Sequence, residues 1–187
     1  NTGSKETVIQ FIDVTTTGNA SDFGDLTAGR ASLMSASSKI RAVAAGGNTG
    51  SAVNVIDYVT IASEGNASDF GDLSSTSQEG TGTGSSTRGL FQLGLATDNV
   101  NTVEYVTIAS TGNATDFGDR TTTAAYGQDS AVSSPTRGVF SGGFISSSVN
   151  IIDYVTIAST GDATDFGDTS VTRYGMGGAS SATRGVF

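Results

Sequence analysis

The chain has 187 residues, of which 36% are hydrophobic and only 14% are charged, and its net charge is −9. With nine Lys and Arg residues and no apolar run near twenty residues, neither a nucleic-acid-binding role nor a membrane span is predicted. Because histidine and cysteine are absent, a Ser-His-Asp triad, a cysteine nucleophile and a zinc site built from His or Cys are excluded.

The sequence repeats itself from end to end. The segment YVTIASTGNATDFGD from Tyr105 recurs from Tyr154 with one change, and more distant copies begin at Tyr58 and Phe11. An aromatic anchor recurs in step at Phe23, Phe70, Phe117 and Phe166, and we expect all four rings to lie in the core and to have a structural role. A recurrent arginine follows the same period at Arg41, Arg88, Arg137 and Arg184. We interpret residues 1–187 as a single repeat domain with units of about 47 residues, covering approximately 1–47, 48–94, 95–143 and 144–187.

Each unit is expected to contribute four short strands. Residues 53–61 are rich in β-branched and aromatic side chains, lie between Gly and Ser clusters, and have apolar groups on both faces. This pattern indicates a strand in a sheet that is covered on both sides. In the unit that contains Phe117, the predicted strands cover approximately residues 77–84, 87–94, 101–110 and 114–119. No window has a sustained helical stripe of apolar residues, so the predicted fold class is all-β.

The order of these signals resembles the kelch repeat. In both, an arginine begins a strand, a second strand ends in Gly-Gly, and a tyrosine and a further aromatic residue follow. The glycine pairs are Gly46-Gly47 and Gly142-Gly143, with Leu93-Gly94 between them, and the matching tyrosines are Tyr58, Tyr105 and Tyr154. Phenylalanine stands where kelch repeats usually have tryptophan. The units also resemble tandem repeats of predicted virion proteins of marine phages.

The kelch resemblance implies a β-propeller of four tandem four-stranded blades. The blades either close a ring of four or form part of a larger ring, and we favour a segment of a longer repeat array. If four blades close a ring, residues 183–187 must pair with the strand near residues 8–14. Kelch-like copper oxidases need a cysteine–tyrosine cross-link and histidine ligands, so that activity does not carry over to this chain.

The aspartates of the DFGD segment have several interpretations. They form the pairs Asp22/Asp25, Asp69/Asp72, Asp116/Asp119 and Asp165/Asp168. Two carboxylates can catalyse glycoside hydrolysis, but a catalytic pair is needed once and not in every unit. The oxygen-rich GNATDFGD segment also suggests calcium, although it lacks the ligand spacing of an EF-hand loop. We favour a structural role, and no metal or cofactor is predicted.

The asparagines of the same segment form sequons at Asn19, Asn66 and Asn113, but the fourth unit has Asp162 there. Since Asn and Asp share turn chemistry and only Asn can be glycosylated, we favour a role in the turn. The recurrent arginines form either a binding ring or structural ion pairs. We favour ion pairs with the DFGD aspartates, which repeat in the same register.

The function predicted from these features is a non-enzymatic structural or adhesive module of a virion appendage or extracellular fibre. The alternative is a carbohydrate-binding or carbohydrate-hydrolysing propeller. Expected partners are other virion or fibre proteins and host surface glycans, and a homo-oligomer remains open. Because the joints after the second and fourth strands differ most between units, their end of the domain is the predicted recognition face. The candidate binding residues are Gln78, Glu79, Asp98, Asn99 and Tyr126.

Overall fold

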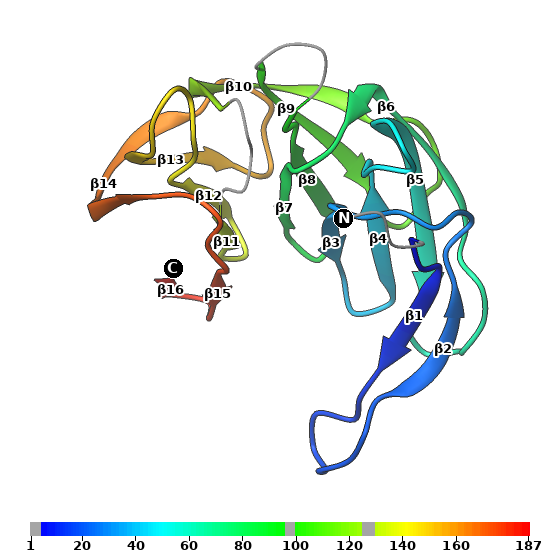
Figure 1. Cartoon of the computed structure of the whole chain (residues 1–187). Helices are drawn as coiled ribbons and strands as arrows, with labels where there is room; N and C mark the ends of the chain where they lie inside the picture. The colour runs from blue at the N-terminus through cyan, green and yellow to red at the C-terminus, as the bar shows by residue number, and fades with distance from the viewer. Residues whose placement is uncertain (1–4, 96–99, 125–129) are drawn as a thin grey trace.

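Three four-stranded antiparallel sheets and two two-stranded sheets lie side by side in an open arc (Figure 1). The structure, a computed structural model, describes residues 5–95, 100–124 and 130–187. Sheet I contains β3 (Met34–Ser37), β4 (Arg41–Ala45), β5 (Val53–Thr60) and β6 (Ser68–Ser77). Sheet II contains β7 (Thr81–Gly84), β8 (Arg88–Gln92), β9 (Val100–Thr107) and β10 (Thr115–Ala124). Sheet III contains β11 (Ser130–Ser133), β12 (Arg137–Ser141), β13 (Val149–Thr156) and β14 (Thr164–Arg173).

A hairpin lies at each end of the arc. The N-terminal hairpin consists of β1 (Val8–Phe11) and β2 (Ser21–Asp25), and the C-terminal hairpin consists of β15 (Ala179–Ser180) and β16 (Gly185–Val186). By sequence, the first matches strands three and four of a unit, and the second matches strands one and two. The hairpins are not paired with each other, so the described residues form no closed ring. The sequence predicts four complete sheets, whereas the described residues form three complete sheets and two half-sheets of two strands each.

The repeated four-stranded, all-β architecture is confirmed, but the strand limits of sheet II differ from those predicted, most of all at two places. The fourth strand of sheet II continues to Ala124 instead of ending at Asp119, because the chain pairs again with Val100 after a register shift. The first strand starts at Thr81, since Ser77 still belongs to β6 and Glu79 turns the chain with a φ of 59°. No helix of the described residues is long and apolar enough to cross a membrane.

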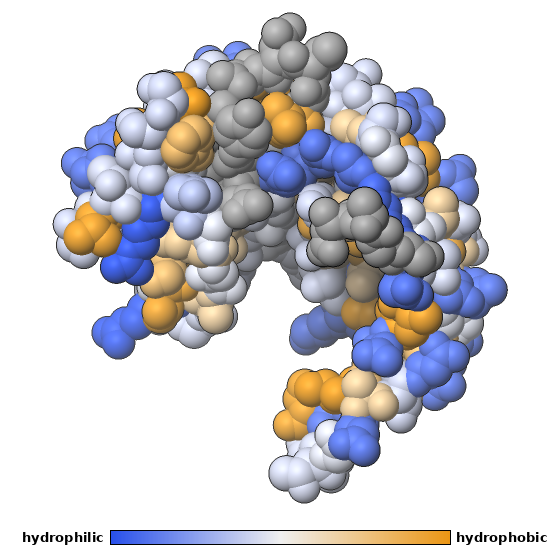
Figure 2. Space-filling view, viewed as in Figure 1, coloured by the Kyte–Doolittle hydropathy of each residue, from blue (hydrophilic) through white to orange (hydrophobic). Residues whose placement is uncertain are grey.

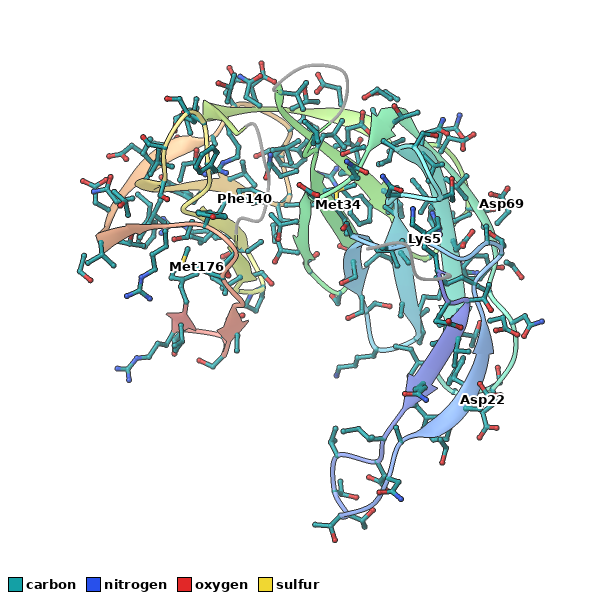
Figure 3. All side chains as sticks on the ribbon, viewed as in Figure 1. Lys5, Asp22, Met34, Asp69, Phe140 and Met176 are labelled. Atoms are coloured by element: carbon teal, nitrogen blue, oxygen red, sulfur yellow. The ribbon has the colours of Figure 1, made fainter. Side chains whose placement is uncertain are left out.

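The hydrophobic core lies between neighbouring sheets. The cluster between sheets I and II includes Met34, Val43, Phe70, Phe91 and Ile108, and the one between sheets II and III includes Leu90, Phe117, Phe140, Val155 and Ile157. Met34 and Phe140 both point into these interfaces (Figure 3). The apolar side chains on both faces of the strands are therefore explained by a neighbour on each side. The first strands β3, β7 and β11 lie next to one another along the inner side of the arc.

The four recurrent phenylalanines do not share one environment. Phe70 and Phe117 are 2% exposed and Phe23 is 9% exposed, but Phe166 is 53% exposed. The expectation that all four lie in the core is wrong for Phe166, because no further four-stranded sheet follows sheet III to cover it. Each ring still packs edge-on against the aromatic residue of the preceding strand, at Phe11, Tyr58, Tyr105 and Tyr154.

Candidate functional site

The near-invariant GNATDFGD segment joins neighbouring sheets. Its turn in sheet II lies against β6: the Gly112 N–H donates to the Phe70 carbonyl at 2.7 Å, and the Ala114 N–H donates to the Asp72 carbonyl at 2.8 Å. In return, the Asp72 N–H donates to Asn113 Oδ1 at 3.1 Å. We call these three hydrogen bonds the turn clamp. The same clamp joins the N-terminal hairpin to sheet I and sheet II to sheet III.

The turn clamp explains the exchange between Asn and Asp in this segment. Asp162 replaces asparagine at the junction of sheets II and III, where its Oδ1 accepts the Asp119 N–H at 3.0 Å. The contact needs only an acceptor oxygen, which both side chains supply. This supports the turn role that we favoured over glycosylation for Asn66 and Asn113.

Three of the four recurrent arginines stack on a tyrosine instead of forming ion pairs with the DFGD aspartates. Arg41, Arg88 and Arg137 lie 4.4, 4.6 and 4.6 Å from the ring centroids of Tyr58, Tyr105 and Tyr154. Arg41 also donates to the Ile108 carbonyl of the next sheet at 3.0 Å. Within the described ranges, none of these arginines makes a salt bridge with a DFGD aspartate. The ion-pair prediction is therefore wrong, because the tyrosine ring holds each guanidinium against the third strand while the aspartates lie on the fourth.

The DFGD aspartates lie apart, on the outer side of the arc. Asp22 and Asp69 both point away from the sheets toward solvent (Figure 3). Asp22 accepts the Gly24 N–H at 3.2 Å, and Asp25 accepts the Thr7 hydroxyl at 2.6 Å. In the part of the chain that the structure describes, no three Asp or Glu side chains are grouped so that they could hold a metal ion. These aspartates therefore make local hydrogen bonds on separate sheets.

A second set of carboxylates is buried between the sheets and was missed by the sequence reasoning. Asp57 and Asp153 are fully buried, on equivalent positions of β5 and β13. Arg30 pairs with Asp57 at 2.6 Å, and Arg120 pairs with Asp153 at 2.9 Å. The two arginines come from different positions of their units. The signal that could have revealed the carboxylates is a recurrent acidic residue directly before the tyrosine of an otherwise apolar strand.

Glu104 occupies the equivalent position of sheet II, where it forms no salt bridge with the residues that the structure describes. The Ser74 hydroxyl and N–H both donate to its carboxylate, and the side chain is 1% exposed. Thr121 makes the same two contacts with Asp153, at 2.8 Å from the hydroxyl and 3.0 Å from the N–H. These carboxylates are thus enclosed and already hydrogen-bonded to the preceding unit. Their contacts join neighbouring units, and Asp57 also lines the groove beside β1.

The variable joints emerge together at one end of the sheets. The Gly47 N–H donates to the Ser77 carbonyl at 2.8 Å, and the Gly143 N–H donates to the Arg173 carbonyl at 3.0 Å. Each bond ties the joint after a second strand to the joint after the fourth strand of the same sheet. Gly46 has a φ of +63°, and a Cβ there would lie 2.5 Å from the Ser77 carbonyl oxygen, so glycine is required. These hydrogen bonds therefore hold the variable joints of the predicted recognition face together at the end of each sheet.

Of the five predicted binding residues, the structure describes Gln78 and Glu79; Asp98, Asn99 and Tyr126 lie outside the described residues. Gln78 is half-buried, and its Oε1 accepts a hydrogen bond from Asn48 Nδ2. Asn48 Oδ1 in turn accepts from Lys5 Nζ. The structure thus brings Gln78 into a polar chain that runs along the variable end, with Glu79 beside it.

An exposed tyrosine at the same end, packed against a half-buried phenylalanine, was not singled out from the sequence. Tyr174 is 53% exposed, and its ring packs edge-on against Phe144 with the centroids 5.2 Å apart. The signal was available: Tyr174-Gly175 repeats the Tyr126-Gly127 dipeptide of the preceding joint. An amphipathic aromatic side chain on a variable loop is the kind of residue that contributes to binding surfaces.

The comparisons with known proteins give no assignment. No family model matches the chain, and no curated protein matches it. The likeness to kelch repeats therefore rests on the pattern of residues within the units.

Proposed function

We propose that the chain is a non-enzymatic structural and adhesive module of a virion appendage or extracellular fibre, built as a segment of a kelch-like β-propeller. In this proposal sheets I–III are complete blades, and the variable loops contact other fibre proteins or host surface glycans. The observation that carries the proposal is that two kinds of segment in each unit make different contacts. The near-invariant segments make the contacts between sheets, whereas the variable joints gather at one solvent-exposed end.

The distribution of ionisable side chains supports a role without catalysis. The buried carboxylates Asp57 and Asp153 are each held by an arginine and a threonine. The exposed DFGD aspartates sit on separate sheets, so a catalytic pair would have to act within one unit and would then be present in every unit. A hydrolytic site would need carboxyl groups facing each other across one bond of the sugar.

The test is a glycan array probed with the labelled domain, with release of reducing sugar measured in parallel. Glu79→Gln changes a carboxylate at the variable end, and Glu64→Gln makes the same change in an exposed turn at the other end. We expect glycan binding without sugar release, and we expect Glu79→Gln to weaken binding more than Glu64→Gln does. Release of reducing sugar would refute the non-enzymatic assignment, and stronger loss with Glu64→Gln would place recognition at the opposite end.

A carbohydrate-binding role is the second candidate, and the exposed ring of Tyr174 favours it. Sugar rings present C–H groups that pack on aromatic faces, while the tyrosine hydroxyl offers a hydrogen bond. Tyr174→Ala should then abolish array binding, whereas Val171→Ala, which removes a comparably exposed side chain from β14, should leave it unchanged. If both variants bind like the unmodified domain, Tyr174 has no part in recognition.

A further inference from the structure

The two ends of the arc contain the two halves of one turn clamp. At closed junctions, a Gly and an Ala N–H donate to carbonyls of the preceding DFGD segment, and an Asn or Asp side chain accepts an N–H from it. The N-terminal hairpin has the same turn at residues 18–20. Strand β14 has the same receiving groups at Phe166 and Asp168. Among the described residues, nothing occupies either half.

Apolar surface is exposed on both sides of the gap, as Figure 2 shows. Phe166 is 53% exposed where Phe117 is 2% exposed, and Val186 is 61% exposed where the equivalent Val43 is 1% exposed. A Cβ on Gly118 would lie 2.5 Å from the docked turn of the next sheet, whereas a Cβ on Gly167 would meet nothing within 4 Å. Each of these positions is covered wherever a neighbouring unit is present.

A groove lies beside each exposed half. The groove at the C-terminal end has a volume of about 390 Å³ and is lined by Arg137, Val139, Phe166 and residues 180–185. The groove at the N-terminal end has a volume of about 260 Å³ and is lined mainly by apolar side chains, including Val8, Leu26, Leu33, Val43 and Val59. Strands three and four of a unit would fill the first groove, and strands one and two would fill the second.

A C-terminal and an N-terminal hairpin placed side by side would form one four-stranded sheet, which we call a composite sheet. The register of the complete sheets predicts the contacts in it. Arg41, Arg88 and Arg137 on the second strand stand opposite Thr60, Thr107 and Thr156 on the third. The same register places Arg184, the residue before β16, opposite Asp13, the second residue after β1, so a carboxylate replaces threonine at this junction alone. The Thr15 hydroxyl and then the Thr15 N–H lower the pKa of Asp13, which favours its charged form. Opposite charges directly across two strands favour their pairing.

We propose that two copies of this chain associate through these ends, with the C-terminal hairpin of one copy and the N-terminal hairpin of a second copy forming one four-stranded sheet. Strand β16 pairs antiparallel with β1 of the second copy, and the turn at residues 18–20 of that copy clamps onto β14. The occupant is a second copy because the turn clamps fix the curvature at each junction of the arc, and this curvature leaves the chain's own hairpins apart (Figure 1). The inference is independent of what the variable loops bind.

The contact is head-to-tail, so it joins different surfaces of the two copies. Such an interface closes a ring if the rotation allows and otherwise extends into a filament. Two copies would supply six complete sheets and two composite ones, a total within the range of known propellers.

Disulfide trapping tests the proposal, because the natural chain has no cysteine. Asp13→Cys and Arg184→Cys are made as separate chains of 187 residues and mixed under mild oxidation. Opposed Cα atoms of antiparallel strands lie at distances that a disulfide accepts. The double variant Arg137→Cys/Thr156→Cys, opposed in the same register within sheet III, calibrates cross-linking within a chain. The negative control mixes Asp13→Cys with Ser181→Cys, which lies one strand further from β1.

We expect a mixed disulfide dimer from Asp13→Cys and Arg184→Cys and none from the negative control. Light scattering on the uncross-linked chain should give at least twice the monomer mass. Phe166→Asp should abolish both signals, whereas Val171→Asp, a similar change on the exposed part of β14, should preserve them. A disulfide within one chain carrying both Asp13→Cys and Arg184→Cys would overturn the proposal, since the chain then closes on itself. A monomeric mass without mixed disulfide, when the calibrating pair forms, would overturn it as well.

Discussion

Phe117 gives the most direct test of how the sheets are held together. Its side chain is 2% exposed between sheets II and III, in contact with the cluster that contains Phe140 and Val155. Truncating a buried phenylalanine to alanine removes its transfer free energy and leaves a cavity, at a cost of about 3–5 kcal/mol. Phe117→Ala also removes the edge-on contact with Tyr105, whose centroid lies 5.8 Å away. We therefore expect a loss of about 3–5 kcal/mol in the free energy of unfolding.

Phe166→Ala is the matched control, because it makes the same change at the equivalent position of sheet III. Its edge-on contact with Tyr154 is the same as that of Phe117 with Tyr105, but Phe166 is 53% exposed. The control should lose mainly the aromatic contact, worth about 0.5–1.5 kcal/mol. The difference between the two variants then isolates the contribution of the covering sheet. The comparison is made at protein concentrations where the chain is monomeric.

Urea unfolding measures the two losses, and native-state hydrogen exchange locates them. Repeat architectures can unfold in steps, so a global transition alone could hide a local effect. Amides of β9 and β10 should lose protection in Phe117→Ala, while those of sheet I should change less. Equal losses for the two variants would refute the reasoning, because burial by the next sheet would then contribute nothing.

Three further predictions concern the polar contacts between sheets. Asp153→Asn should cost about 3–5 kcal/mol in urea unfolding because it removes the buried salt bridge with Arg120. Glu104→Gln, at a position where the described residues form no salt bridge, should change stability by about 1 kcal/mol or less. Asn113→Ala should cost about 1 kcal/mol through loss of the clamp hydrogen bond, and Asn113→Asp should have the melting temperature of the unmodified chain. If both variants melt at the temperature of the unmodified chain, the side-chain contact is dispensable. Gly118→Ala should lower the melting temperature more than Gly167→Ala, since both have a positive φ but only the first Cβ would collide with a neighbouring turn.

Much of the architecture was predictable because its signals are local and repeated. The alternation and composition of residues 53–61 indicate a strand wherever that segment lies, and its recurrence every 47 or so residues indicates the repeating unit. Gly46-Gly47 and Gly142-Gly143 mark joints, because their positive φ values are a property of the backbone itself. Repeated strands separated by such joints are enough to specify all-β sheets of four strands.

The candidate recognition face was predictable in part. Comparing the units identified the end with variable joints, and hydrogen bonds between the joints confirm that they emerge together. The same comparison did not single out Tyr174, whose exposure depends on how its loop packs against Phe144.

The tertiary structure decided which side chains are buried and which residues the arginines contact. Phe117 and Phe166 lie in nearly identical sequences, yet only the first is buried, because burial depends on whether another sheet lies alongside. The arginines and aspartates repeat in one register, but a guanidinium reaches only what the fold places within a few ångströms, which here is a tyrosine ring. Arg30 and Arg120 reach equivalent carboxylates from different positions of their units, because distances between sheets and not spacing along the chain determine ion pairing.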